Sequence, residues 1–148
     1  MRVSQILRSK PDRLIVISPQ ASLQEASKLI LNERVGMLLV DRGHGQIVGT
    51  LSERDLICFL ARNGGGAITS KVESAMAEIT LRASPTDKVS DLMSLMTEQR
   101  TRHLPVFEGA RLVGVLSIGD VLKSRLAEQA QETEVLRDMA RVSLAIAA

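Results

Sequence analysis

The sequence predicts a mixed α/β fold, of the α+β kind, in which two β-α-β-β-α repeats form similar halves and an extended helix follows them. The first observation is a motif: residues Gly49–Asp55 (Gly-Thr-Leu-Ser-Glu-Arg-Asp) return 65 positions later as Gly114–Asp120 (Gly-Val-Leu-Ser-Ile-Gly-Asp). The second is that the copies align beyond the motif, with Ser18-Pro19 matching Ser84-Pro85. Two copies of this size favour half-domains packed on each other over a solenoid, whose repeats are usually shorter.

The first copy shows the patterns of each element in order. Ser22 followed by Glu25 is a capping-box pattern, and the helical period behind it ends at Gly36. The glycines after Asp41 predict a hairpin turn. The expected elements are a helical piece at 3–8, a strand at 14–17, a helix from 22 to 36, strands at 37–40 and 47–51, and a helix from 52 to about 62.

The second copy repeats this order after Asn63-Gly64-Gly65-Gly66, which predicts a flexible boundary. We therefore assign residues 1–66 and 67–127 to the two halves and 128–148 to a C-terminal helical extension. The extension carries an apolar stripe, which predicts packing on its own body or on a second subunit. The expected elements are a helical piece at 71–76, a strand at 79–83, a helix at 87–100, strands at 104–107 and 112–116, and a helix from 117.

Composition excludes several classes of function. A net charge of +2, two phenylalanines and no tyrosine or tryptophan argue against nucleic-acid binding. The single cysteine excludes an internal disulfide, and no apolar run is long enough to span a membrane, so we expect a cytoplasmic protein. The cysteine and the two histidines have neither metal-ligand nor triad spacing, so we expect no metal and no enzymatic activity.

The repeated motif brings polar groups to the point where a strand meets a helix. In each copy a serine stands at the expected helix N-terminus, where backbone N–H groups are free, and an aspartate follows three residues later: Ser52 and Asp55, then Ser117 and Asp120. This pattern has two interpretations. It is a helix cap by itself, or its carboxylate accepts hydrogen bonds from the two vicinal hydroxyls of a ribose.

The repeat resembles a tandem pair of CBS domains, the Bateman module. The resemblance covers roughly residues 1–127 and rests on the element order and on two stretches, Leu51–Leu56 and Arg102–Val106, which are similar to those of small stand-alone bacterial CBS-pair proteins. It implies two halves related by a pseudo-two-fold, with two clefts for adenine nucleotides. We expect AMP first, with ATP or NAD(H) as alternatives.

The resemblance also implies roles for particular residues. It assigns Asp55 and Asp120, with Ser52 and Ser117 beside them, to the ribose. Arg54, Arg102 and His103 are the candidates for phosphate contacts, although an ordinary exposed position is the alternative for Arg102 and His103. Relatives often carry threonine where this chain has Val16 and Arg82. The base is therefore expected among aliphatic residues, and the candidates for that contact are Val16, Ile17, Leu104 and Pro105.

These inferences lead to one functional expectation and one alternative. The expected function is a regulatory nucleotide-binding module that senses energy or redox state, forms a homodimer and signals to an unidentified partner protein. The alternative is a non-catalytic interaction scaffold whose nucleotide clefts are vestigial.

Overall fold

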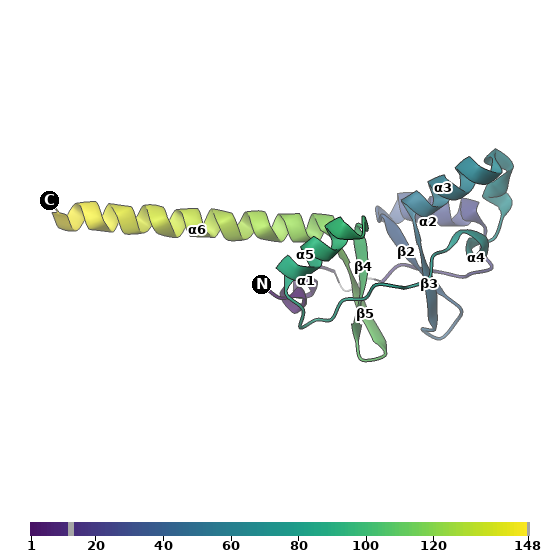
Figure 1. Ribbon diagram of the computed structural model, residues 1–148, viewed down its shortest axis with the longest axis horizontal. Coiled ribbons are helices and arrows are strands. Elements are labelled where there is room, and N and C mark those ends of the chain that lie inside the picture. Colours follow the sequence, from purple (N-terminus) through teal and green to yellow (C-terminus); the bar gives the residue numbers. More distant parts are fainter. Residues whose placement is uncertain (12–13, 148) are drawn as a thin grey trace.

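The structure is a computed structural model that describes residues 1–11 and 14–147 (Figure 1). Its element order matches the predicted repeat except for one additional 3₁₀ helix, η1, and the absence of the strand predicted at 79–83 among the described residues. The elements are α1 (Val3–Arg8), β1 (Val16–Ile17), α2 (Leu23–Glu33), β2 (Met37–Asp41), β3 (Ile47–Ser52), α3 (Glu53–Asn63), η1 (Gly65–Thr69), α4 (Val72–Ala75), α5 (Val89–Glu98), β4 (His103–Glu108), β5 (Arg111–Ser117) and α6 (Ile118–Ala147).

The two halves have the same strand register. In the first half β1 is parallel to β2, which is antiparallel to β3, whereas β4 and β5 form an antiparallel pair. A bulge follows the fourth paired residue of both β2 and β4. Asp41 pairs with Ile47 across five intervening residues, and the equivalent Phe107 pairs with Leu112 across four. The repeats therefore differ in length at the hairpin turn, where chains tolerate such changes.

The strand predicted at residues 79–83 is reduced to a single bridge, between Ala83 and Val106. In the first half, the N–H of Leu39 donates to the carbonyl of Ile15 at 2.9 Å and extends the pairing of β1 with β2. The repeat places Pro105 at the position of Leu39, and proline has no N–H to donate. The second half therefore lacks this hydrogen bond, and its first strand does not extend beyond the bridge.

Helix ends differ from the sequence expectations in two places. The Ser22–Glu25 capping box forms as predicted, but α2 ends at Glu33, and Arg34 adopts a left-handed conformation with φ of 54°. Gly36 is therefore outside the helix. The predicted flexible boundary at 63–66 is mostly ordered, because Asn63 ends α3 and η1 begins at Gly65.

The first helix of each repeat packs on the opposite half. Val3 and Ile6 of α1 are buried in the core of the second half, with Leu104 among their neighbours. Val72 of α4 is buried in the core of the first half, beside residues such as Leu23. The boundary predicted at residue 66 follows the repeat in sequence, whereas each packed half is discontinuous along the chain.

Matching backbone hydrogen bonds hold the two exchanged helices. The N–H of Ser4 donates to the carbonyl of Pro85 at 2.9 Å, and the N–H of Glu73 donates to that of Pro19 at 3.0 Å. Pro19 and Pro85 are equivalent in the repeat. In Figure 1, α1 and α5 lie beside β4 and β5, while α2, α3 and α4 lie beside β2 and β3. The internal repeat is therefore a repeat of packing as well as of sequence.

Helix α6 begins at the end of β5 and then leaves the body of the protein (Figure 1). Val121 is its one buried residue within the described chain. The exposed large apolar residues of this helix are Leu122, Leu126, Val135, Leu136, Met139, Val142, Leu144 and Ile146. The predicted C-terminal extension is thus the outer part of one continuous helix, and it does not pack on its own body.

The exchanged packing of α1 predicts a large effect from a substitution near the start of the chain. Ile6→Ala should lower the free energy of unfolding by about 2–5 kcal/mol, because it leaves a cavity in the second-half core. Urea unfolding measures this change. Leu31→Ala on α2 is the control, since Leu31 is 76% exposed and its replacement should change stability by less than about 0.5 kcal/mol. Equal effects of the two substitutions would contradict the packing of α1.

Candidate functional site

A cleft of about 1020 Å³ is lined by both halves of the protein. The first half contributes Leu14, Ile15 and residues 33–37, from the end of α2 to the start of β2. The second half contributes most of β5 and the first turn of α6. Residues of α1 and of the segment that follows it complete the lining. The cleft is large enough for a nucleotide-sized molecule.

The two motif corners are built alike. At the start of α3, the N–H of Ser52 donates to Oδ2 of Asp55 at 2.8 Å, and the N–H of Asp55 donates to Oγ of Ser52 at 3.1 Å. Ser117 and Asp120 repeat both hydrogen bonds at the same distances. Both aspartates therefore cap their helices in this structure. Ser117 and Asp120 also line the cleft, so their corner combines the cap with an accessible carboxylate.

A lysine distinguishes the second corner from the first. Lys10 Nζ lies 2.6 Å from Oδ2 of Asp120 and 3.0 Å from the carbonyl oxygen of Val115. At the first corner, Oγ of Ser52 donates to Oδ2 of Asp55 at 2.8 Å instead. The carbonyl of Thr50, equivalent to that of Val115, accepts the backbone N–H of Ala77 at 2.8 Å. One corner is thus completed by a side-chain cation and the other by neutral groups.

The electrostatics of Asp120 follow from these contacts. Burial alone would raise the pKa of the Asp120 carboxyl, but hydrogen bonds from Lys10 and Ser117, together with the charge of Lys10, outweigh burial and lower the pKa. The carboxylate is therefore ionised at neutral pH. It can accept hydrogen bonds from ligand hydroxyls, and charged acceptors make the stronger hydrogen bonds.

His103 lies at the start of β4 and contacts the first half directly. A Cβ added to Gly36 would lie 2.8 Å from Cε1 of His103, so only a glycine at position 36 leaves room for the ring. Burial lowers the pKa of His103 below its ordinary value, and the charges of Lys10 and Arg102 act in the same direction. Glu53 and Asp120 oppose that change. The imidazole is therefore mostly neutral at pH 7.

The remaining predicted site residues are dispersed. Arg54 and Arg102 are exposed, and neither is among the described residues that line the cleft. Val16 is exposed on β1. Ile17 and Leu104 lie in the two cores, and Pro105 is buried with its carbonyl accepting the N–H of Ala83. Of the residues proposed from sequence, the cleft brings together Ser117, Asp120 and His103.

Several residues that line the cleft were not among the sequence candidates. Lys10 is the most important, and the apolar wall is supplied by Leu14, Ile15, Leu112 and Val113. The apolar residues could have been found as the flanks of the predicted strands. Lys10 had no such signal, because it follows a short helix and has no equivalent lysine in the second repeat.

The described residues contain no group of three or more histidine, cysteine, aspartate or glutamate side chains that could hold a metal ion. Within residues 1–11 and 14–147, no helix combines the length and the apolar character needed to cross a membrane.

Comparison with known proteins identifies the family. The CBS domain pattern matches the chain twice, at residues 3–62 and 72–127, which correspond to the two repeats. The chain belongs to the CBS domain family. It is a tandem CBS pair, and the fold expected from the repeat is confirmed.

The chain is similar to several small CBS proteins. It is 31% identical over 119 residues to the CBS domain-containing protein CBSX3, mitochondrial, of Arabidopsis thaliana, covering 78% of this chain and 58% of that protein. Among solved structures, it resembles the CBS-domain containing protein ATU1752 from Agrobacterium tumefaciens (TM-score 0.79, 34% identity, covering 84% and 98% of the chains). A putative signal-transduction protein with CBS domains from Burkholderia ambifaria is equally similar (TM-score 0.81, 34% identity, 87% and 96%).

Other similar structures were solved with ligands or as assemblies. The CBS domain pair of protein MJ0100, in complex with 5′-methylthioadenosine and S-adenosyl-L-methionine, matches with a TM-score of 0.72 and 26% identity over 88% of this chain and 98% of that one. CBSX2 in complex with AMP shares the fold, with a TM-score of 0.71 and 24% identity over 86% and 98%. A hexameric CBS-CP12 protein from bloom-forming cyanobacteria matches 96% of this chain and 85% of that one, with a TM-score of 0.73 and 27% identity.

The buried position of His103 predicts a pH dependence of stability. Its pKa is lowered in the folded protein, so the unfolded chain binds the proton more readily, and the stabilising contribution is lost as the pH falls below about 6.5. His103→Met introduces the residue found at the equivalent position of the first half, Met37. Between about pH 8 and about pH 5, the melting temperature of the variant should fall less than that of the parent protein, as differential scanning calorimetry would measure. An equal fall would contradict the effect.

Proposed function

We propose that the protein is a non-catalytic regulatory module that binds an adenine nucleotide in the cleft containing Asp120. The observation that carries the proposal is the corner formed by Ser117 and Asp120, where an ionised carboxylate at a helix N-terminus opens into a cleft lined by both halves. A carboxylate can accept hydrogen bonds from both hydroxyls of a ribose. The adenosine ligands of similar CBS structures support this choice of ligand.

The charges and apolar residues around the corner fit the rest of a nucleotide. Among the described lining residues, the positively charged ones are Arg8, Lys10, Arg34 and Arg111, against Glu33, Glu108 and Asp120. This excess favours a ligand with a phosphate. The apolar wall formed by Ile15, Val35 and Val113 offers contacts to a base without an aromatic ring. AMP is the simplest ligand with these groups, and ATP and NAD(H) share them.

Calorimetric titration of nucleotide-free protein with AMP, ATP and NADH tests the proposal. Asp120→Ala should weaken binding at least tenfold, a loss of about 1.4 kcal/mol or more, since charged hydrogen bonds are worth about 1.5–3 kcal/mol each. Asp55→Ala is a matched control, because it removes the same kind of helix cap from a corner outside the described cleft lining. Loss of binding in the control alone, or no binding by the parent protein, would overturn the proposal.

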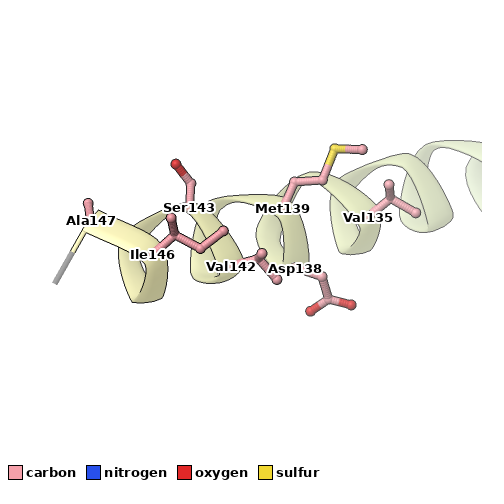
Figure 2. A pocket seen from close by; sticks show the side chains of 7 residues that line it. All are labelled: Val135, Asp138, Met139, Val142, Ser143, Ile146 and Ala147. Carbon is pink, nitrogen blue, oxygen red and sulfur yellow. The ribbon is translucent and has the colours of Figure 1, made fainter.

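We further propose that the chain self-associates through the last turns of α6. Val135, Met139, Val142 and Ile146 follow the 4-3-4 spacing of a coiled-coil seam and are exposed (Figure 2). Continued toward the body, the same spacing reaches Glu132 and Glu128, which would end the apolar contact. The charged residues among these turns, Glu134, Arg137, Asp138 and Arg141, carry no net charge, so a second copy suits the surface better than an anionic membrane.

A charge placed in the seam tests this proposal. Met139→Glu combined with Val142→Glu should convert the oligomer to monomer, because it buries like charges at the centre of the contact. Light scattering coupled to size-exclusion chromatography over a concentration series gives the mass. Leu144→Glu is the control, since Leu144 is 72% exposed but lies off the seam. A monomeric parent protein, or loss of the oligomer in both variants, would contradict the predicted interface.

In the proposed function the cleft senses the nucleotide, and the signal passes to a regulated partner protein. The alternative of an interaction scaffold is favoured by one observation, the exposed apolar stripe of α6. The two functions are compatible, since the stripe and the cleft lie on different parts of the chain.

A further inference from the structure

The geometry points to Lys10 as the residue that makes the cleft select phosphorylated adenosine ligands over unphosphorylated ones. Lys10 contacts Oδ2 of the Asp120 carboxylate, and a ribose whose two hydroxyls bind both carboxylate oxygens must displace it. A ligand with a phosphate offers the ammonium group a new partner, whereas a neutral nucleoside offers none. This inference rests on the proposed function and names the residue that sets its ligand class.

The contacts of Lys10 show why it competes for the carboxylate. Its Nζ lies 2.6 Å from Oδ2 of Asp120, the same oxygen that accepts the N–H of Ser117. The side chains are 33% and 21% exposed, so the pair is partly shielded from water and is worth more than a fully solvated one. A ribose hydroxyl that takes over this oxygen must therefore replace a charged hydrogen bond with a neutral one.

The first half shows the same corner without a competitor. Oδ2 of Asp55 accepts only groups of Ser52 among the hydrogen bonds of the described residues. The backbone carbonyl that Lys10 contacts at Val115 is bound at the equivalent Thr50 by the N–H of Ala77. The first half satisfies both contacts with neutral groups, one from Ser52 and one from the N–H of Ala77 in the segment after α4, which indicates that the charge of Lys10 is the added feature.

The surroundings of Lys10 provide the place for a phosphate. Arg8 and Arg34 line the same cleft as Lys10. Arg34 adopts a left-handed conformation after α2, as the equivalent Arg100 does after α5. An ammonium on a four-carbon side chain can move from Asp120 toward an anion held in this part of the cleft.

Affinities of adenosine and AMP for the parent protein, Lys10→Met and Arg8→Met test the inference. Lys10→Met should bind adenosine about fivefold more tightly, the scale of a partly buried ion pair, and should lose most of the preference for AMP over adenosine. Arg8→Met removes a cation from the same lining without a contact to Asp120. It should weaken AMP moderately and leave adenosine unchanged. Melting temperatures of the ligand-free proteins establish that each variant is folded.

Each remaining outcome counts against the role of Lys10, and one of them also counts against the proposed function. If the parent protein and Lys10→Met both bind AMP with the same preference over adenosine, or if Lys10→Met weakens both ligands equally, the role of Lys10 is wrong and the proposed function stands. If neither protein binds either ligand, the proposed function fails and the role of Lys10 fails with it. If Arg8→Met also binds adenosine more tightly, the gain comes from the lower positive charge of the cleft. That result would exclude direct competition between Lys10 and the ribose.

Discussion

The exchange of the first helices between the two halves is the constraint on which the rest of the structure depends. Each hydrophobic core is completed by a helix from the other repeat: α1 fills the second-half core with Val3 and Ile6, and α4 fills the first-half core with Val72. After each of these helices the chain must return to its own half. Lys10, which follows α1, contacts Asp120, and Leu14 and Ile15 line the same cleft. The cleft is thus a consequence of how the cores are completed, since burial of apolar side chains supplies most of the stabilisation of either half.

The repeat allowed much of the fold to be predicted from the sequence. Two aligned copies gave the element order, the position of the length change and the two corners, because local patterns such as the Ser52–Asp55 capping box determine helix starts directly. The exchange of α1 and α4 was not predictable in the same way. A helix of six residues with three apolar side chains fits either core, and only the full packing decides between them. The absence of a strand near Ala83 could have been predicted from the sequence, because Pro105 cannot donate the hydrogen bond that Leu39 provides.

The site was less predictable than the fold, because its residues come from segments with no common pattern. Asp120 and Ser117 belong to the motif and were found, whereas Lys10 has no counterpart in the other repeat. Ile17 and Leu104 were assigned to the base because apolar strand residues can hold one, yet both lie in the cores. Ile17 lies on the edge strand β1 and Leu104 on the two-stranded sheet of β4 and β5, and successive side chains of a strand point to opposite faces. Sequence alone therefore identifies the strand but not which of its residues reaches the cleft.

If the proposed function holds, the exchanged packing gives a ligand in the cleft a route to α6. Lys10 follows α1, and α1 packs against the core that contains Val121, the buried anchor of α6. The amino group of Met1 lies 3.9 Å from Glu128, further along the same helix.

A ligand changes a conformational equilibrium only through interactions that differ between the two states. In the proposed mechanism the contact between Lys10 and Asp120 is such an interaction, because a ribose hydroxyl and the ammonium compete for Oδ2 of Asp120. Movement of Lys10 would act first on the end of α1. Because α1 and the start of α6 share the second-half core, a shift of α1 would act on α6. In the part of the chain that the structure describes, the hydrogen bonds to the Asp55 side chain come from neutral groups of Ser52, so the two corners differ by the cation at Asp120.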